Sequence, residues 1–416
     1  MKLIDANTTC TDMTRAASLS PIERTRLFGL AALIFLILAS YAIARPATES
    51  LFLEVHGSKS LPTAWLLVGL GSLVVVTVYN RFAATTDLVR IFGAVSAISA
   101  ATLVAILAAM KTDLPGVHWI LYLWKDLYIV VLIEIFWSFA NCTVPEDRAK
   151  WWYGLFCVLG SLGGMAGNLG VGWMAQATST QQSLWAVVAL LGIAGAGGMV
   201  LARWAGVQAD GPKEKPSLLD GFKVLRSSRS LWLLMALIGT TQIVITLVDY
   251  QFSVAVETHY PDADARTAII GQVYAAIDLA SISLQLTTGP IIRLLGLHWV
   301  LMAIPGVLGC AVVGFAMVPK FLAIATGKVA SKALDYSLFR AAKEILYIPL
   351  GHAERTQGKA FVDMMSYRMA KGATSLMLIG LVALGRPDLA LGVTIACILL
   401  WIWLTAQLSR GHNLKP

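Results

Sequence analysis

Long apolar segments separated by short polar ones run along almost the whole chain. A bilayer core about 30 Å thick is crossed by roughly 20 apolar residues in a helix, so each segment predicts one membrane-spanning helix. The predicted spans lie near residues 27–44, 61–80, 89–110, 117–141, 151–175, 184–206, 231–252, 267–289, 298–317, 321–348, 359–383 and 388–408. The longest polar stretch between spans, Val207 to Ser230, leaves six of them on each side. The pattern therefore predicts an all-α polytopic membrane protein built from two six-helix bundles.

This division gives five expected units. They are an N-terminal tail over residues 1–26, a six-helix bundle over 27–206, a linker over 207–230, a second six-helix bundle over 231–408 and a C-terminal tail over 409–416. The first span follows Arg24 and Arg26 and ends in small residues, as the core of a signal peptide does. Its apolar run is long enough to cross the bilayer, so we expect a helix that is retained.

The composition agrees with a membrane protein and excludes several other classes. Hydrophobic residues make up 57% of the 416 residues, charged residues make up 13%, and the mean hydropathy is +0.72. The net charge of +8 comes from basic residues dispersed over short loops, so no nucleic-acid partner is expected. The five cysteines are scattered without a Cys-x-x-Cys pair, and no phosphate-binding Gly-x4-Gly-Lys loop occurs. No metal and no cofactor are expected.

The distribution of basic residues predicts the orientation in the membrane. Lys and Arg are retained on the cytoplasmic side of a membrane protein. Of the 32 Lys and Arg residues, roughly 19 lie in the two tails, the linker and the loops on their side, whereas six lie in the opposite loops. We therefore expect a multi-pass protein of the cell inner membrane with both termini in the cytoplasm.

Charged residues inside the spans indicate an inner cavity. Ionised groups in the hydrocarbon region are costly, so they face water, one another or a substrate. Away from their ends, spans 3, 6, 9 and 12 carry none, like the peripheral helices of the major facilitator architecture, which a six-plus-six chain resembles. The charged residues within spans are Lys125, Asp126, Glu134, Asp249, Asp278, Lys328, Lys332, Asp335, Arg340, Lys343, Glu344, Asp363, Arg368 and Lys371.

Span 10 holds the densest group of these charges. At 3.6 residues per turn, Lys328, Lys332 and Asp335 fall on one face of a helix, and Lys332 lies near the middle of the bilayer. Lys371 of span 11 reaches a similar depth. Local pairing of Lys332 with Asp335, and extension of Lys343 to the membrane boundary, are alternative explanations. They leave an excess of cations on spans 10 and 11, which indicates a small anionic substrate.

Two further sets of charged residues allow more than one interpretation. Lys125 and Asp126 of span 4 and Asp278 of span 8 are either ligand contacts or members of gating salt bridges. Asp262 and Asp264 form an Asp-x-Asp motif that binds divalent ions in some enzymes, which suggests an integral membrane enzyme acting on lipid-linked phosphates as a rival function. Because this motif lies in a polar external loop, solvated surface is the favoured explanation.

Several stretches of the chain resemble a known family. SKALDYSLFRAAKEILYIPL (331–350) and GKAFVDMMSYRMAKGATSL (358–376) are similar to the end of the ATP/ADP translocases, the nucleotide transporters of plastids and obligate intracellular bacteria. FWSFAN (136–141) and RPATESL (45–51) resemble that family's segments in its fourth helix and just after its first helix. The resemblance spans nearly the whole chain and implies a major facilitator fold with a retained first helix.

The resemblance implies a secondary transporter, and no enzyme, that exchanges adenine nucleotides or a related anionic metabolite by alternating access. The residues expected to bind the anion are Lys328, Lys332, Arg368, Lys371, Tyr336, Phe339 and Lys343, the two aromatic ones by stacking on a base. The residues expected to gate or couple transport are Arg45, Glu49, Lys125, Asp126, Asp249, Asp278 and Asp335.

The sequence departs from the family at two lysines. One of them is Thr48 here, and a lysine expected early in the second helix has no counterpart between Leu61 and Tyr79. Some positions of this kind bind the phosphates or set exchange in the family. An exporter of another phosphorylated or carboxylated metabolite on the same fold is therefore the alternative function.

Overall fold

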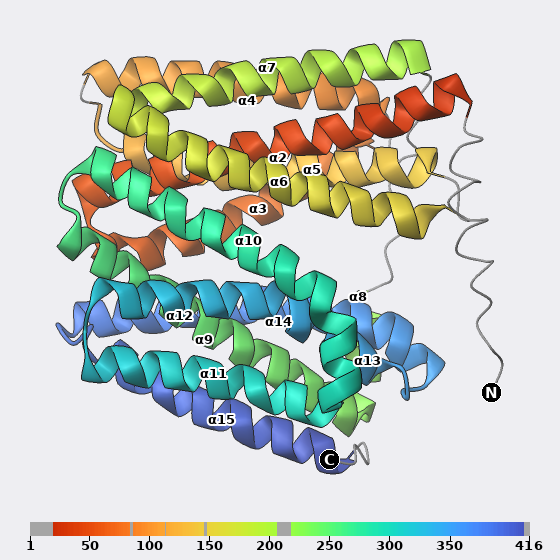
Figure 1. The fold of residues 1–416 in the computed structure, drawn as a ribbon, viewed down its shortest axis with the longest axis vertical. Helices are drawn as coiled ribbons and strands as arrows, with labels where there is room; N and C mark the ends of the chain where they lie inside the picture. Colours follow the sequence, from red (N-terminus) through yellow and green to blue (C-terminus); the bar gives the residue numbers. More distant parts are fainter. Residues whose placement is uncertain (1–19, 84–85, 113, 145–147, 206–217, 412–416) are drawn as a thin grey trace.

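The computed structural model describes residues 20–83, 86–112, 114–144, 148–205 and 218–411, and within these ranges the chain forms helices joined by short turns (Figure 1). The helices of the first half are α2 (Pro21–His56), α3 (Leu61–Ala83), α4 (Leu88–Ala109), α5 (Val117–Thr143), α6 (Ala149–Ala177) and α7 (Thr180–Ala205). Two short 3₁₀ turns, η1 (Ser58–Ser60) and η2 (Met110–Thr112), interrupt the connections.

The second half contains α9 (Arg229–His259), α10 (Ala263–Leu295), α11 (Leu297–Met317), α12 (Phe321–Leu334), η3 (Asp335–Phe339), α13 (Arg340–Tyr347), η4 (Glu354–Gly358), α14 (Lys359–Ala383) and α15 (Leu389–Gly411). A ten-residue helix, α8 (Leu218–Ser227), precedes them inside the predicted linker. Most of the two predicted tails, and residues 207–217 of the linker, lie outside the described residues.

Each predicted span coincides with a helix or with a continuous run of helical segments. Nine of the described helices are long and apolar enough, by length and composition, to cross a membrane. The other predicted spans are α5, the α12–η3–α13 run and α14, and these three carry most of the charged residues within spans. These charged residues are the reason why the three fall outside the nine, although the apolar pattern predicts them.

The first helix is much longer than its apolar run predicts. Ser20 and Glu23 form a capping box at its start, and the helix continues for 36 residues to His56 instead of ending at residue 44. The predicted external segment that begins at Arg45 is therefore helical, and Arg45 pairs with Glu49 one turn later. Pro46 is tolerated inside this helix, and the polar residues around it face the interior of the protein.

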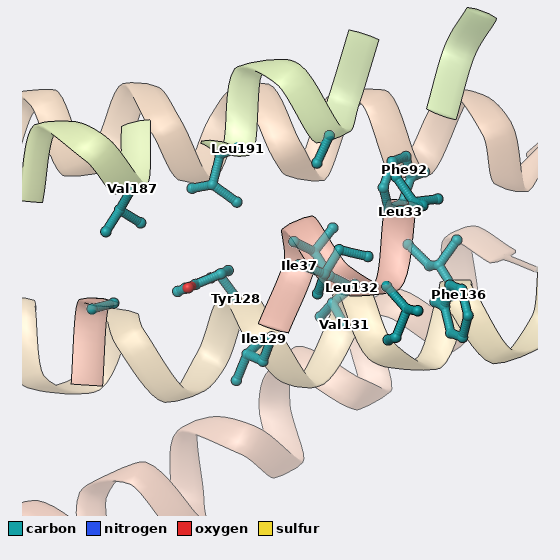
Figure 2. Close-up of a cluster of buried hydrophobic side chains, with 14 of the residues drawn as sticks. Leu33, Ile37, Phe92, Tyr128, Ile129, Val131, Leu132, Phe136, Val187 and Leu191 are labelled. Atoms are coloured by element: carbon teal, nitrogen blue, oxygen red, sulfur yellow. The ribbon is translucent and has the colours of Figure 1, made fainter. Parts of the chain in front are cut away.

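Two separate hydrophobic cores correspond to the two halves of the chain. The first is formed by α2, α4, α5, α6 and α7 with the end of α3, and Figure 2 shows Leu33, Phe92, Leu132 and Leu191 packed within it. The second is formed by α8 to α15. Close backbone contact strengthens the first core, because a Cβ atom on Gly163 of α6 would lie 2.4 Å from a carbonyl oxygen of α2.

The two bundles meet mainly through α6 and α10, and α10 crosses diagonally between them (Figure 1). A Cβ atom on Gly271 of α10 would lie 2.4 Å from the backbone oxygen of Asn168 of α6, so the two helices are in backbone contact. Helices α4 and α7 form one edge of the molecule in Figure 1, and α11 and α15 form the opposite edge. The charge-free spans are thus peripheral, as the sequence predicts.

Candidate functional site

A cavity of about 660 Å³ lies between the two bundles. Helices α2, α3 and α5 line it from the first bundle, and α9, α10, α12, η3 and α14 line it from the second. The described residues of α4, α7, α11 and α15 contribute nothing to its wall. The cavity therefore lies where the pattern of charges predicts an interior space, with α2 and α3 as additional walls.

The charged lining of this cavity has an excess of cations. Its basic side chains are Arg45, Lys125, Lys328, Lys332, Arg368 and Lys371, and its carboxylates are Glu49, Asp126 and Asp249. With all nine groups ionised, these six cations and three anions leave three positive charges uncompensated within the lining. Such a cavity attracts an anion.

Asp249 of α9 binds two lysines of α12 at once. Its carboxylate oxygens lie 3.0 Å from the Lys328 ammonium and 2.9 Å from the Lys332 ammonium. Lys328 is only 2% exposed and also lies 4.6 Å from the centre of the Phe252 ring. The alternative that Lys332 pairs locally with Asp335 is wrong, because the adjacent helix α9 supplies the carboxylate and Asp335 instead accepts a hydrogen bond from an amide of α9.

A second group joins the two bundles beside the cavity. Arg45 and Glu49 of α2 form an ion pair of 3.4 Å, and the Tyr274 hydroxyl of α10 donates to Glu49 over 2.9 Å. The Arg45 guanidinium lies 3.9 Å from the centre of the Tyr274 ring. Arg45 and Glu49 are therefore both held by one tyrosine of the opposite bundle.

A third group lies on α5. Lys125 is 2% exposed, its ammonium lies 2.8 Å from Asp126, and it sits 4.0 Å from the centre of the Tyr122 ring. Asp126 also accepts a hydrogen bond of 2.9 Å from Tyr41. The charge of Lys125 is therefore compensated by residues of its own helix, on the cavity wall formed by the first bundle.

Arg368 and Lys371 of α14 differ from the other cations. Among the described side chains, no carboxylate lies within 4.0 Å of either one, so neither is part of an ion pair. Both face the cavity. Tyr336 and Tyr367 line the same wall and are 38% and 49% exposed, so their rings are open to a ligand.

Four predicted site residues lie away from the cavity lining. Phe339 is 3% exposed and packs edge-on against Trp401, because the π-helical turn η3 changes the helical phase after Asp335. Lys343 forms an ion pair of 3.0 Å with Asp363, which joins α13 to α14. Asp335 is bound to Gln242, and Asp278 is bound to Asn168; neither lines the cavity.

The Asp-x-Asp motif has a structural role. Asp262 caps α10 by accepting a hydrogen bond of 2.8 Å from the Ala265 amide. Asp264 accepts a hydrogen bond of 2.6 Å from the backbone of Thr180 in the other bundle. The two carboxylates thus serve separate backbone contacts instead of one metal site.

Arg266 is a functional candidate that the sequence pattern does not reveal, because it lies just before the apolar run of span 8. It lies in α10, is 3% exposed, and donates to the backbone oxygens of Tyr260, Pro261 and Ser50. The bond to Ser50 crosses between the bundles. Its flanking charges and its proximity to the loop concealed this role, because only the three-dimensional fold brings α2 beside the start of α10.

The wall formed by α3 is uncharged. It consists of Leu61, Trp65, Leu66, Val68, Gly69, Leu70, Ser72, Leu73 and Val76. Thr48, which replaces a family lysine, is 1% exposed and donates to the Arg45 carbonyl, so it does not line the cavity either. The two absent lysines therefore leave that side of the cavity without positive charge.

Two helical bundles around a central charged cavity are the architecture of the major facilitator fold. The family model described as TLC ATP/ADP transporter matches residues 116–326 and 309–412, and the chain belongs to this family. Membership of a family described as transporters favours transport over the rival function of an enzyme acting on lipid-linked phosphates.

Named relatives are ADP,ATP carrier proteins. The chain is 25% identical over 334 residues to ADP,ATP carrier protein 1 of Chlamydia pneumoniae, covering 68% of this chain and 65% of that protein. It is also 25% identical over 332 residues to the chloroplastic ADP,ATP carrier protein 1 of Arabidopsis thaliana, covering 69% of this chain and 52% of that protein. The chain thus matches between about half and two thirds of the length of these relatives.

Solved structures of other transporters share the fold. The nucleoside transporter NupG aligns with a TM-score of 0.67 at 13% identity, covering 94% of this chain and 100% of that chain. A bacterial homologue of the iron transporter ferroportin in its inward-facing state aligns with a TM-score of 0.71 at 12% identity, covering 94% and 99%. At these identities the likeness establishes the fold alone.

Proposed function

We propose that this protein exchanges adenine nucleotides, or a related anionic metabolite, across the membrane by alternating access. The observation that carries the proposal is the excess of cations in the central cavity, where Arg368 and Lys371 have no carboxylate partner among the described residues. The naming of its relatives as ADP,ATP carriers supports a nucleotide as the cargo.

The lining provides groups for each part of such a substrate. Lys371 and Arg368 bind phosphate oxygens, the first as a point charge and the second through a planar fork of donors. Lys332 joins them when the phosphate chain draws its ammonium from Asp249. Tyr336 and Tyr367 offer open rings for stacking on a base, which contributes about 1–3 kcal/mol per base in nucleic-acid complexes.

Alternating access requires that the cavity be closed at one end. Hydrogen bonds join the bundles at the ends of α2, α6 and α10 that lie near His56, Ala177 and Ala263. With both termini in the cytoplasm of a bacterial-type inner membrane, as we propose, this closed end is external. The TM-score to the ferroportin homologue is 0.71 for its inward-facing state and 0.59 for its outward-facing state. This difference supports the proposal that the cavity of this protein opens to the cytoplasm.

A second cargo is favoured by one observation. The α3 wall and the buried Thr48 leave one side of the cavity without the positive charge that the resemblance implies. A cavity with one uncharged wall suits an anion with fewer phosphates, or a phosphorylated or carboxylated metabolite with an apolar part. Export of such a metabolite on the same fold is the alternative.

The test is nucleotide exchange by purified protein in liposomes. We expect uptake of labelled ATP that requires unlabelled ADP inside the vesicles. Lys371→Ala removes a charge-assisted hydrogen bond, which contributes about 1.5–3 kcal/mol, so the apparent affinity should fall roughly tenfold to a hundredfold.

Lys111→Ala is the matched control, because Lys111 is an exposed lysine of η2 outside the cavity. Its uptake should equal that of the wild type. Uptake that is unchanged in Lys371→Ala would remove the cavity cations from the binding site. A folded wild-type protein that exchanges no nucleotide, yet takes up another anion in a Lys371-dependent manner, would establish the alternative cargo.

A further inference from the structure

Asp278 of α10 is a carboxylate within the membrane-spanning region that has no cationic partner. No Lys or Arg nitrogen of the described residues lies within 4.0 Å of it. It lies 15 residues beyond Ala263, which is roughly 22 Å along the helix axis. A carboxylate at such a depth is costly unless it is paired, protonated or hydrated.

The partner of Asp278 is an amide from the opposite bundle. Asn168 of α6 is 5% exposed, and its Nδ2 donates to the Asp278 carboxylate over 2.9 Å. The other half of the same amide, the Asn168 Oδ1, is buried and receives no hydrogen bond from the described residues. An unsatisfied buried acceptor costs about 1–3 kcal/mol. When the Asp278 carboxylate is ionised it has no proton to donate, so the Asn168 Oδ1 stays unsatisfied.

A proton on Asp278 supplies the missing donor. An ionised carboxylate only accepts hydrogen bonds, whereas a carboxylic acid has one O–H donor and one free acceptor oxygen. A protonated Asp278 therefore donates to Asn168 Oδ1 while it accepts from Nδ2, which satisfies both halves of the amide. The proton comes from bulk water and returns to it, so no further reactant is needed.

The charged groups on the elements around α10 are engaged elsewhere and do not replace this proton. From α2, Arg45 attracts Asp278 but is paired with Glu49, and α6 contributes only the neutral Asn168 and Gly164 at this point. On other elements that pack against α10, Asp249 of α9 binds Lys328 and Lys332 of α12, and Asp335 of η3 binds Gln242.

We propose that Asp278 and Asn168 form a proton-binding site that couples protonation to the movement of the two bundles. The two residues lie on different bundles, and the pair exists only while α6 and α10 are in contact. The conformation with this contact therefore binds the proton more tightly than a conformation in which water reaches the carboxylate. By linkage, protonation favours the contact to the same extent. The proposal rests on the chain being a transporter but not on its cargo.

The experiment measures the conformation directly, without any substrate. The full-length protein, with its five cysteines replaced by serine, receives spin labels at Gln176→Cys of α6 and Thr258→Cys of α9, which are exposed near the closed end. Distances between the labels are recorded in liposomes from pH 5 to pH 8. We expect the short distance to dominate at low pH, and the ratio of short to long distances to change by up to about tenfold per pH unit.

Two variants test whether Asp278 is the responsible group. Asp278→Asn replaces the protonated acid by an amide that pairs with Asn168 through both of its groups, so the short distance should dominate at every pH. Asn168→Leu keeps the carboxylate but removes its partner, so the pH dependence should weaken at least severalfold. Asp388→Asn, which changes an exposed loop carboxylate paired with Arg386, should titrate like the parent protein.

Three results would overturn the proposal. They are a wild-type distance that is independent of pH, an unchanged titration in Asp278→Asn, and a shift that occurs only with sodium and not in potassium buffer. The last result would assign the site to a sodium ion. ATP uptake measured on the same vesicles separates the two proposals. If the folded protein takes up no ATP, the nucleotide cargo is refuted, whereas the distance titration alone decides the proton site.

Discussion

Asp249 controls the charge balance on one side of the cavity. Its single carboxylate compensates two ammonium groups, one of them on the almost fully buried Lys328. The sequence identifies Lys328 and Lys332 as cavity residues because charges within an apolar span are rare. It does not identify their partner, because proximity across two helices depends on the relative rotation of α9 and α12.

Replacement of this carboxylate should destabilise the protein. Asp249→Asn leaves Lys328 as a buried cation without a counter-ion, and the loss of one member of a buried pair costs about 3–5 kcal/mol. The measurement is the apparent melting temperature of the purified protein in detergent. Lys332→Met serves as the comparison, because it leaves Asp249 bound to Lys328 and should change the melting temperature much less.

The double variant Asp249→Asn with Lys328→Met isolates the cause. Removal of the stranded ammonium should restore most of the lost stability, because an apolar chain of similar length is tolerated in a buried position. Equal melting temperatures for Asp249→Asn and the double variant would show that the loss has another origin than an uncompensated charge.

At the scale of elements, the sequence predicts where the spans lie but not the helical irregularities within them. The apolar runs locate α3, α4 and α11 to within a few residues, because lipid-facing helices must be apolar along their whole length. The π-helical turn η3 leaves no such mark. It alters the helical phase beyond Asp335, which is why Phe339 lies in the core although helical periodicity places it on the face of Lys332.

Helix contact between the bundles depends on glycine at one position. In Gly271→Ala the new Cβ atom would meet the backbone oxygen of Asn168 at 2.4 Å, so α6 and α10 cannot keep their present distance. In this variant we expect the labels at positions 176 and 258 to report longer distances at every pH. The melting temperature of the protein should change little, because the interior of each bundle is unaltered.

Gly170→Ala of α6 is the matched control for this substitution. Nothing lies within 4 Å of a Cβ atom built at Gly170, and alanine is the better helix former. Its distances should equal those of the parent protein. Gly163→Ala should differ from both, because its Cβ atom would collide with α2 inside the first bundle and thereby destabilise that bundle. Identical effects at all three glycines would contradict the assignment of Gly271 to the contact between bundles.

At the scale of the whole molecule, the two bundles are held together at one end by bonds to backbone groups. Arg266 contributes one of them, since it donates to Ser50 across the bundles and to Tyr260 and Pro261 within its own bundle. The Ser50 hydroxyl returns a bond of 2.7 Å to the Ala263 carbonyl. Such contacts break completely when the helices separate, which suits a reversible closure.

Arg266→Ala should therefore open this end. The Ser50 carbonyl loses its donor, so the population with long distances between the labels at positions 176 and 258 should rise severalfold at constant pH. Arg266→Lys should not restore closure, because one ammonium cannot reproduce the planar fork of the guanidinium. Arg386→Ala, which removes an exposed loop arginine, is the control. An unchanged distance distribution in Arg266→Ala would show that closure rests on other contacts.

The architecture as a whole follows from the sequence more directly than the site does. Six apolar runs on each side of a polar linker, with charges confined to certain spans, are consequences of the bilayer and predict two bundles around an interior. The site depends on longer-range geometry. Arg45 and Glu49 seemed external because charges ended the apolar run, yet α2 continues through them and Tyr274 of the other bundle holds both.

The shared carboxylate of Asp249 also bears on selectivity among anions. A small monovalent ion offers Lys328 and Lys332 no more negative charge than the aspartate that already occupies them, so displacement gains little Coulomb energy. A phosphate chain brings several charges to the same place. Asp249 thus competes with any anion for the two lysines, and only an anion with more than one negative charge displaces it favourably. On the proposed function, chloride and bicarbonate therefore bind in the cavity more weakly than a polyanion does.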